Sequence, residues 1–570
     1  MLLVPARAGS RRVPGKNMRP VAGIPLVGWA VRVARRAADM LDGGPHLVVC
    51  STDDAAIAEV ARAWGAHRVV ERPAALAGDS AASVDVALHA LDVVEDRSAR
   101  FRSLVLLQPT SPLTYPTDVC AAVGQLDAGS ESIASVTPSH PVGWHMAMRG
   151  DDRVRPAAGS AGGRDLLTGA IYAIRTSALR ASGRFVADGT VGLVVPAERS
   201  VDIDEEHDFV IAEAMLAARS TRPVPLGDRD IGAGPVFIIA EVGVNHDGSV
   251  DLAHRLVDAV GDSGADAVKF QTFEPAALAS AGAATADYQR SAGAGDDQRA
   301  MLNRLALPRD AWAGLQSHAT DRGLAFLSTP FDDESAALLD GLGVPAFKVG
   351  SGELTNVPFL ERLARRGRPL LVSTGMADIV EVATALDAIG SAGDPPVALF
   401  HCVSSYPARL SDANLRAIET MRRAFGVPVG WSDHTPGIEL PLAAVSLGAS
   451  LIEKHITLNR ALPGPDHLSS LEPRELAAMV AGIRSVEAAL GSGAKVPVAS
   501  ERDIAVVARR SLYWRRSLDA GSTVTAADLT ALRPGTGISP TRQWSLVGRE
   551  TIRRVVAGAA VLPDDVAGDA

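Results

Sequence analysis

The sequence is poor in cysteine, and this scarcity limits its covalent and metal chemistry. Among 570 residues there are three cysteines, Cys50, Cys120 and Cys402, and none of them forms a CxxC pair. Disulfide frameworks and cysteine zinc sites need several cysteines at short, regular spacing. The composition therefore argues against both, and it favours a reducing compartment.

Long apolar runs and an excess of basic charge are lacking too. No apolar stretch approaches the roughly 20 residues that cross a bilayer, and the first residues, MLLVPARAGSRR, do not have the pattern of a signal peptide. We therefore expect a cytoplasmic protein that binds no membrane. The formal charge of -10 argues against a general nucleic-acid surface. Small anionic substrates remain compatible with it, because local basic pockets can oppose the net sign.

The length and the alternation of short strands predict several α/β domains. A chain of 570 residues exceeds what one hydrophobic core usually organises. In residues 1–226, β-rich runs such as HLVVCSTD and SLVLLQPT alternate with Ala-rich stretches of helical period. This pattern is typical of a mostly parallel α/β sheet. Proline and glycine in TRPVPLGDRDIGAGP predict a domain boundary near Leu226.

A second alternation, in residues 227–500, predicts a (β/α)8 barrel. Its eight strand candidates are VFIIAEVG, DAVKFQT, AFLSTPF, AFKVGS, PLLVSTG, VALFHC, PVGWSD and LIEKHIT. The segment is close to the roughly 250 residues that such barrels need. Residues 501–570 are expected to form a small β-rich module that is too short to rely on its own core.

Polar residues cluster where the predicted barrel strands end, which is where these barrels carry their active sites. Two lysines, Lys269 and Lys348, fall at this mouth and are unsuited to an apolar core. A Schiff-base lysine is one alternative. His434 and His455 end adjacent strands and could bring two imidazoles to one divalent ion.

A basic loop near the N-terminus suggests a phosphate site. The run LVPARAGSRRVPGKN is a strand followed by a glycine-containing loop, whose N–H groups could cradle phosphates while Arg7 and Lys16 offset charge. Its spacing is not that of a Walker loop. Asp202 and Asp204, in SVDIDEEHDF, end an extended run, and this spacing places them on one face and suits Mg²⁺. A purely structural loop and a solvated acidic turn are the alternatives.

Together with LLQPTSPL, these motifs resemble the CMP-sialic acid synthetase family of cytidylyltransferases over about residues 1–220. The resemblance implies that the anomeric hydroxyl of a sugar attacks the α-phosphate of CTP and releases pyrophosphate. It implies Mg²⁺ on Asp202 and Asp204, which with Lys16 would be catalytic. The implied CTP-binding residues are Arg7, Ser10, Arg11, Lys16, Arg72 and Gln108. The chain has Thr168 where the family has an asparagine. A nucleotide-binding module without catalysis is therefore an alternative.

The barrel motifs IIAEVGVNHDG, DAVKFQT, FLSTPFD, FKVGSGE, STGM, FHCVSSYP, GWSDHTPG, LIEKHIT and LPGPDH resemble, in order, the sialic acid synthase family. The terminal module resembles that family's antifreeze-like (SAF) domain. The resemblance implies condensation of phosphoenolpyruvate with an N-acetylhexosamine to a nonulosonic acid, with release of phosphate. The hexosamine that it implies is N-acetylmannosamine. Legionaminic or another nonulosonic acid is the alternative product.

The same resemblance assigns roles at the barrel mouth. Glu353, His434 and His455 would be catalytic, and the two histidines would hold Mn²⁺ or a similar ion. Arg533, in LRPGTGIS, would reach the sugar pocket of a partner subunit, so that the chain would act as a homodimer or a higher homo-oligomer. The other implied substrate-binding residues are Glu241, Lys269, Gln271, Thr329, Lys348, Ser351, Ser373, Ser404, Tyr406, Ser432 and Asp466.

Overall fold

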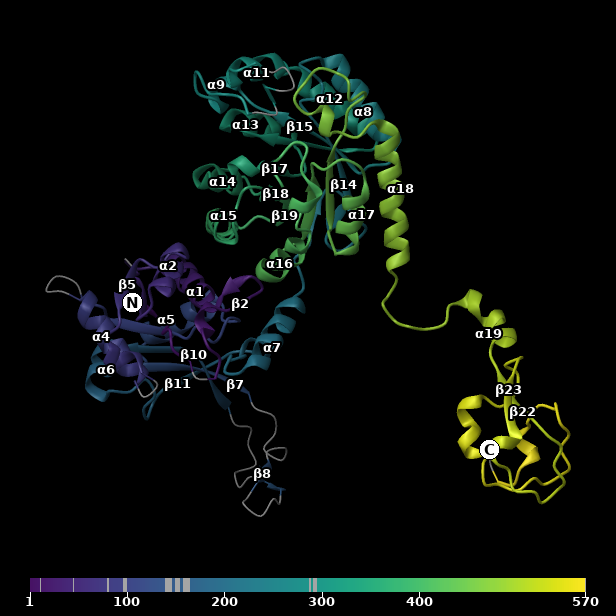
Figure 1. Ribbon diagram of the computed structural model, residues 1–570. Coiled ribbons are helices and arrows are strands. Elements are labelled where there is room, and N and C mark those ends of the chain that lie inside the picture. The colour runs from purple at the N-terminus through teal and green to yellow at the C-terminus, as the bar shows by residue number, and fades with distance from the viewer. Residues whose placement is uncertain are drawn as a thin grey trace. The chain divides into compact units, whose positions relative to one another are not determined.

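The computed structural model describes residues 1–10, 12–44, 46–78, 81–95, 100–138, 146–148, 154–156, 165–286, 289–290 and 295–568 (Figure 1). The predicted CTP ligand Arg11 lies outside the described residues. The chain divides into two compact units, Met1–Ala489 and Leu490–Ala570. Within the described residues, no helix combines the length and the apolar character that a membrane span requires.

The N-terminal part of the first unit is built on a seven-stranded sheet. Strand β10 is antiparallel to both of its neighbours, and the other pairings are parallel, as the sequence predicted. The strands, in sheet order, are β11 (Val191–Val194), β7 (Ser132–Pro138), β10 (Asp165–Arg175), β6 (Ser103–Leu107), β1 (Leu2–Pro5), β4 (Val48–Thr52) and β5 (Arg68–Glu71). Two short two-stranded pairs accompany it, β2 (Pro20–Val21) with β3 (Ile24–Pro25) and β8 (Met146–Met148) with β9 (Val154–Pro156).

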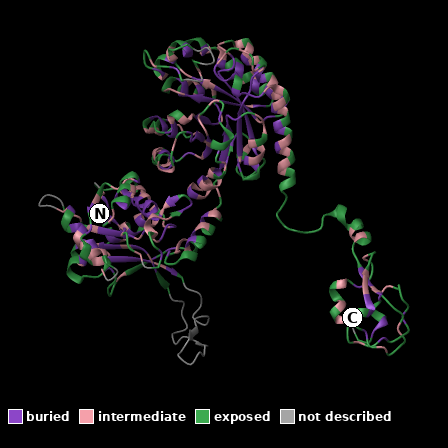
Figure 2. Ribbon diagram, in the orientation of Figure 1, coloured by how far each residue is buried: buried purple, intermediate pink, exposed green. Residues whose placement is uncertain are grey.

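Helices cover both faces of this sheet, because alternate residues of each strand face opposite sides. Leu2 and Val4 join one core and Leu3 the other. The first core lies under α1 (Leu26–Met40), α2 (Ala55–Ala63), α5 (Pro116–Asp127) and α7 (Glu206–Ala217). The second lies under α4 (Ser83–Val94) and α6 (Thr176–Ser182). In Figure 2 the strands are mostly buried and the outer helix faces exposed.

The second part of the first unit is an eight-stranded parallel barrel, which confirms the predicted fold class. Its strands are β14 (Phe237–Gly243), β15 (Ala267–Thr272), β16 (Ala325–Pro330), β17 (Phe347–Val349), β18 (Leu370–Ser373), β19 (Val397–Cys402), β20 (Val429–Asp433) and β21 (Leu451–His455). The hydrogen-bonded order runs from β16 through β15, β14 and β21 round to β17. Strands β16 and β17 then lie side by side and close the barrel.

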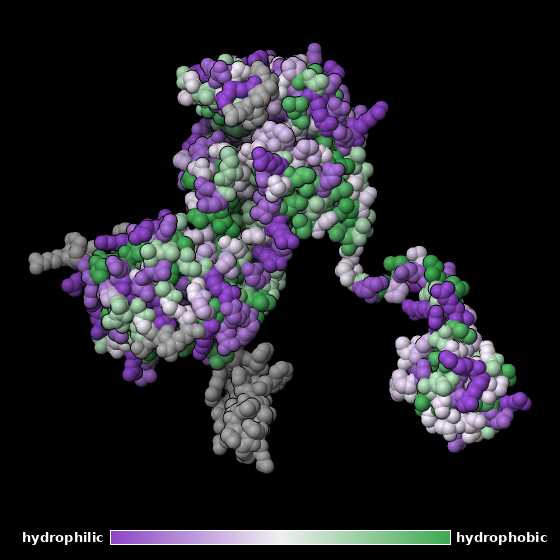
Figure 3. Space-filling model, in the orientation of Figure 1, coloured by the Kyte–Doolittle hydropathy of each residue, from purple (hydrophilic) through white to green (hydrophobic). Residues whose placement is uncertain are grey.

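Helices surround the barrel, and most of them share one large apolar core with the outward faces of the strands. Figure 3 shows hydrophilic and hydrophobic residues intermixed on the visible surface of this outer layer. The helices are α8 (Val250–Ser263), α9 (Pro275–Leu278), α11 (Gln298–Leu305), α12 (Ala311–Asp321), α13 (Asp333–Leu342), α14 (Val357–Ala364), α15 (Ile379–Ala392), α16 (Arg416–Phe425), α17 (Glu439–Ser446) and α18 (Pro473–Leu490). The exceptions to the shared core are α9 and α11, which pack in a separate small apolar cluster.

Along β14 and β21, the inward-facing residues change from apolar to charged. Phe237 and Ile239 belong to the apolar cluster at the bottom of the barrel, and Glu241 follows them on the same face. The same alternation carries β21 from Leu451 to Glu453. Since barrel interiors are filled in layers, the upper layer becomes a buried ring of polar groups at the carboxyl ends of the strands.

A short hairpin supports the bottom of the barrel. Strands β12 (Val224–Leu226) and β13 (Arg229–Ile231) pair in antiparallel fashion, and their apolar residues pack with the bottom cluster. The boundary predicted near Leu226 thus falls inside an element that is buried against the barrel.

The second unit is small and has few regular elements. It contains α19 (Arg502–Ala508) and a hairpin of β22 (Ser511–Trp514) and β23 (Leu529–Leu532), joined by isolated bridges. Its core gathers Leu512, Trp514 and Leu546. The indole N–H of the buried Trp514 donates to Asp565 Oδ2 at 3.1 Å.

Candidate active sites

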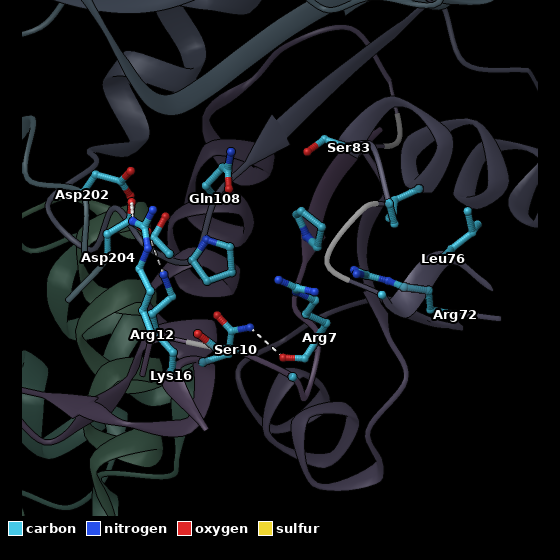
Figure 4. Close-up of a pocket in the computed structure, with 18 residues that line it drawn as sticks. Arg7, Ser10, Arg12, Lys16, Arg72, Leu76, Ser83, Gln108, Asp202 and Asp204 are labelled. Atoms are coloured by element: carbon cyan, nitrogen blue, oxygen red, sulfur yellow. Dashed lines mark hydrogen bonds and ion pairs between the residues drawn. The ribbon is translucent and has the colours of Figure 1, made fainter. Parts of the chain in front are cut away.

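The N-terminal loop and the carboxylate segment line one cavity of about 540 Å³ (Figure 4). Asp202 and Asp204 lie at one end of it and Arg72 lies at the other, with Arg7 and Gln108 between them. The structure thus brings together the described residues that the sequence predicted for CTP and Mg²⁺, which are Arg7, Ser10, Lys16, Arg72, Gln108, Asp202 and Asp204.

Strand ends position the basic groups of this cavity. Arg72 follows β5 and is buried, with Nη2 donating to Ser51 O at 2.7 Å and Nε to Ser51 Oγ at 3.3 Å. Asn17 Nδ2 donates to Arg7 O at 2.9 Å and so holds the loop after β1 in a curve. Lys16 Nζ crosses the cavity to Ile203 O at 2.7 Å and to Asp204 Oδ1 at 3.2 Å.

The two carboxylates differ in their environment. They come from a loop before α7, not from the strand end that the sequence suggested. Asp204 is paired with Lys16 and with Arg12 Nη1 at 2.9 Å. The pKa of Asp202 is raised, mainly by partial removal from water and also by Asp204, while the Thr110 hydroxyl opposes the shift. Asp202 is therefore the carboxylate better placed to take an added cation.

Arg12 lines this cavity, and Thr168 lies in the neighbouring strand without lining it. Arg12 was not predicted, although it is the second arginine of the SRR run, because sequence alone could not separate it from Arg11. Thr168 is buried in β10, and its hydroxyl lies 2.6 Å from Ser135 Oγ. Gly169 follows with φ +78, and a β-carbon there would lie 3.7 Å from Asp202 Oδ2.

The barrel mouth holds a buried network of two lysines and two glutamates. Lys269 Nζ lies 2.6 Å from Glu241 Oε2 and 3.7 Å from Glu453 Oε2. Lys348 Nζ lies 3.3 Å from Glu453 Oε1. Glu453 therefore bridges both lysines, although it was not among the predicted site residues. It could have been predicted, because it lies two residues before His455 and so points to the same inner face of the strand.

Hydroxyl groups complete the network from neighbouring strands. Lys269 donates to Thr329 Oγ1 at 3.2 Å, and Lys348 donates to Ser373 Oγ at 2.7 Å. Ser432 donates to Glu453 Oε1 at 2.8 Å, and Gln271 donates to Glu241 Oε1 at 3.3 Å. Thr329, Ser373, Ser432 and Gln271 were each predicted as substrate-binding residues, and the structure gathers them around the two lysines.

The charges shift the two glutamates in opposite directions. Burial raises the pKa of Glu241 to about 7, against the charge of Lys269. Burial acts on Glu453 as well, but the charges of Lys269 and Lys348 lower its pKa to about 2. Glu453 is therefore the fixed counter-ion of the lysines, whereas Glu241 can exchange a proton near neutral pH.

The two histidines lie together beside this network. The rings of His434 and His455 are 5.5 Å apart, and Tyr406 lies 4.2 Å from His434, centroid to centroid. Burial lowers the pKa of His434 and takes that of His455 well below its ordinary value, so both imidazoles are neutral. His434 Nδ1 lies 2.8 Å from Val403 O, a pure acceptor, so this nitrogen carries the proton and Nε2 keeps its lone pair.

The remaining groups surround the histidines and the rim. Asp466 Oδ2 lies 3.9 Å from His455 Nδ1, and burial raises the pKa of Asp466 to about 6. Gly375 donates its N–H to Ser351 Oγ at 3.1 Å, with Ser404 on the same side. Glu353 accepts from Asn356 Nδ2 at 2.7 Å. None of the described contacts joins Glu353 to the lysines or histidines. Arg533 lies in the second compact unit.

An α/β domain with a basic cavity, followed by a barrel with lysines and imidazoles at its mouth, defines an enzyme with two catalytic-type domains. The chain belongs to the NeuB family, which its residues 256–495 match. Residues 1–147 match the cytidylyltransferase family, and residues 509–567 match the SAF domain.

Two related synthases agree with this assignment, and one solved structure is similar to the chain. The chain is 44% identical over 331 residues to the N,N'-diacetyllegionaminic acid synthase of Legionella pneumophila, covering 57% of this chain and 93% of the relative. It is 42% identical over 316 residues to the synthase of the same name from Campylobacter jejuni, covering 55% and 95%. A crystal structure of N-acetylneuraminic acid synthetase from Leptospira borgpetersenii is 35% identical, covers 50% of this chain and 96% of that chain, and has a TM-score of 0.44.

Proposed function

We propose that the chain catalyses two successive reactions: condensation of phosphoenolpyruvate with an N-acetylated hexosamine to a nonulosonic acid, and transfer of CMP from CTP to that acid. The observation that carries the proposal is the pair of buried lysines at the barrel mouth, bridged by Glu453. It is supported by the match of the two domains to families of consecutive reactions.

The lysine network suits phosphoenolpyruvate. Lys269 and Lys348, with Thr329 and Ser373, would present cations and hydroxyl donors to its phosphate and carboxylate. C3 of phosphoenolpyruvate would attack the open-chain aldehyde, water would add at C2, and the adduct would lose phosphate. Glu241, with a pKa of about 7, is suited to accept a proton from that water.

His434 and His455 fit a divalent cation such as Mn²⁺. Both are neutral, and buried His455 Nδ1 has no hydrogen-bond partner among the described residues. Within the described part of the chain, no group of three or more His, Cys, Asp or Glu side chains is arranged to hold a metal ion. The remaining ligands would therefore be water and substrate. When bound, the ion would polarise the sugar aldehyde.

In the N-terminal cavity, Arg7, Arg12, Lys16 and Arg72 would neutralise the triphosphate. Asp202, which pairs with no cation among the residues that the structure describes, would hold Mg²⁺, with Asp204 joining it once its pairs with Arg12 and Lys16 loosen. A bound Mg²⁺ would stabilise charge on the phosphates. The chain's own part is to position the sugar hydroxyl in line with the α-phosphate.

The sugar itself is proposed by class. Two relatives with over 40% identity are N,N'-diacetyllegionaminic acid synthases, so a diacetamido hexose should be tested beside N-acetylmannosamine. Mass spectrometry of the products from phosphoenolpyruvate, CTP and each sugar tests the proposal. Absence of both a nonulosonic acid and its CMP ester with every sugar would refute it.

The two reactions should be separable, because each domain has its own residues. Asp202→Ala combined with Asp204→Ala should reduce CMP-sugar formation by at least about a hundredfold and leave phosphate release from phosphoenolpyruvate unchanged. The exposed Asp188→Ala in the same domain is the matched control. Equal loss of both activities in a folded double variant would contradict the division. Wild-type protein that forms the acid but releases no pyrophosphate from CTP would favour a non-catalytic nucleotide module.

A further inference from the structure

A second cavity, of about 500 Å³, lies away from both active sites within the first compact unit. It is formed by α1, the loop before α5, the residues after α7 and the end of α16. Its size is within the range of small-molecule sites, which is roughly 300–1,000 Å³. None of the residues that line it was assigned a role in either proposed reaction.

Arg219 gives this cavity an uncompensated positive charge. Its guanidinium lies 5.1 Å from the centre of the Tyr115 ring. In the part of the chain that the structure describes, no carboxylate lies within ion-pair distance of it. Burial lowers the pKa of Arg219, and the nearby charges of Arg199 and Arg32 act in the same direction, with Tyr115 opposing them. Holding a half-buried cation without a counter-ion costs free energy, and a bound anion would remove that cost.

The other charges of the cavity leave the balance positive. Arg32 makes a two-pronged pair with Asp387 at 2.9 and 3.1 Å, and Arg36 lies 3.4 Å from the same carboxylate. One carboxylate thus serves two guanidinium groups. Arg199, which also lies over the Tyr115 ring, is paired with Asp118 at 2.5 Å. That carboxylate is therefore already engaged.

Aromatic side chains form the remaining walls. Tyr115 is partly exposed, and Phe425 lies 5.3 Å from the Arg32 guanidinium. Trp29 lines the cavity from α1, with its indole N–H held by Val21 O at 3.0 Å. A ligand must therefore combine an anionic group for the arginines with a planar or apolar part for these rings.

We propose that this cavity is a binding site for a phosphate ester of mononucleotide size, with its phosphate on Arg219 and Arg36 and its ring against Tyr115 and Phe425. Arginine is suited to this because its planar fork binds phosphate through two hydrogen bonds. The site is formed by elements that belong to both catalytic-type domains, so its occupancy stabilises their contact. The inference depends on this geometry and not on the proposed reactions.

Equilibrium binding of AMP to the full-length protein tests the proposal, by calorimetry. Wild-type protein should bind AMP saturably, and Arg219→Ala should weaken binding about tenfold to a hundredfold, the loss expected for a charge-assisted hydrogen-bonded pair. Arg36→Ala, which removes the other proposed phosphate ligand, should weaken it in the same direction. Arg222→Ala is the matched control, because Arg222 lies three residues further on, pairs with Asp394 at 3.6 Å and does not line the cavity.

Binding of the two parts of AMP, measured separately, shows whether the cavity recognises the phosphate, the nucleoside or both. Inorganic phosphate and adenosine should each bind much more weakly than AMP. The proposal is overturned if wild-type protein shows no saturable binding at millimolar AMP, or if Arg219→Ala and Arg36→Ala bind as tightly as Arg222→Ala. Equal affinity for phosphate and AMP would overturn the aromatic half of the site, and equal affinity for adenosine would overturn the anionic half.

Discussion

At the scale of single residues, the barrel mouth shows how one buried carboxylate can organise two cations. Lys269 and Lys348 come from different strands and would repel each other at the same mouth without a shared counter-ion. Glu453 lies 3.7 Å from one and 3.3 Å from the other, and Ser432 fixes its orientation. The lysines are thereby held ready for a substrate that carries two anionic groups.

Glu453→Gln should therefore impair the synthase reaction. The substitution keeps the shape but removes the charge, and breaking a buried ion pair costs about 3–5 kcal/mol. We expect phosphate release to fall at least about tenfold, with a lower midpoint of thermal unfolding. The exposed Glu334→Gln, paired with Arg309 at 3.8 Å, is the control and should behave as wild type. Wild-type rates in Glu453→Gln would show that the bridge is not needed.

The two imidazoles lead to a prediction on metal. Chelation should stop phosphate release, and added Mn²⁺ should restore it in the wild type but less well in His434→Ala, since one of two protein ligands is gone. His207→Ala, on the exposed surface of α7, should be rescued fully. Metal titrations of the chelated proteins measure the difference. Full activity after chelation would disprove the two-histidine site.

At the scale of elements, the strands were predictable and their supports were not. Each of the eight barrel runs predicted from the sequence forms a strand, because each is a short run in which the strand begins with apolar residues. The hairpin of β12 and β13 gave no such signal, since it is short and owes its burial to the barrel bottom. Asp202 and Asp204 were expected on a strand, but a loop carries them.

The site residues likewise divide into those that the strand pattern predicted and those that it did not. Those that end a strand, such as Lys269 and Ser373, could be named because the barrel rule says where strand ends meet. Glu453 and Arg12 could not, since their importance appears only once neighbouring strands and loops fix which charges they contact. Glu353, which was named from the family pattern, contacts Asn356 instead of the lysine network.

The loop after β18 makes a prediction at this scale. A β-carbon at Gly375 would collide with Ser404 Oγ and lie 2.8 Å from Ser351 Oγ and 3.0 Å from Cys402 Sγ. Gly375→Ala should therefore displace both serines. Small displacements in an active site can cost up to about a hundredfold in rate, so we expect phosphate release to fall about tenfold or more.

The control for this loop is Gly341→Ala in α13, where an added β-carbon would have no atom within 4 Å. It should keep full activity, and helix propensity should leave it slightly stabilised. Steady-state phosphate release and thermal unfolding of both variants decide the matter. Equal activity of the two would mean that the serines move freely and that their placement is unimportant.

At the scale of the whole molecule, the chain joins three sequence families in one polypeptide, and each part has its own core. If the two families catalyse consecutive reactions, their fusion in one chain would supply the two catalytic domains in equal amounts. The core of the second compact unit is small, and a unit of this size is marginal by itself. Its expected role in the synthase depends on Arg533.

We expect the synthase to work as an oligomer in which Arg533 serves the barrel of another subunit. Arg533 follows β23 and is exposed, and within the described residues no carboxylate of its own chain lies within ion-pair distance of it. Arg533→Ala and His434→Ala chains, each poorly active alone, should regain part of the synthase activity when co-expressed, because a mixed dimer pairs one intact barrel with one intact arginine. Differently tagged chains, purified through both tags, provide the mixed population for the phosphate-release assay. Arg515→Ala, an exposed arginine of the same unit, is the matched control and should be active alone. Mixed dimers without any recovery would show that Arg533 acts within its own chain or has no role in the reaction.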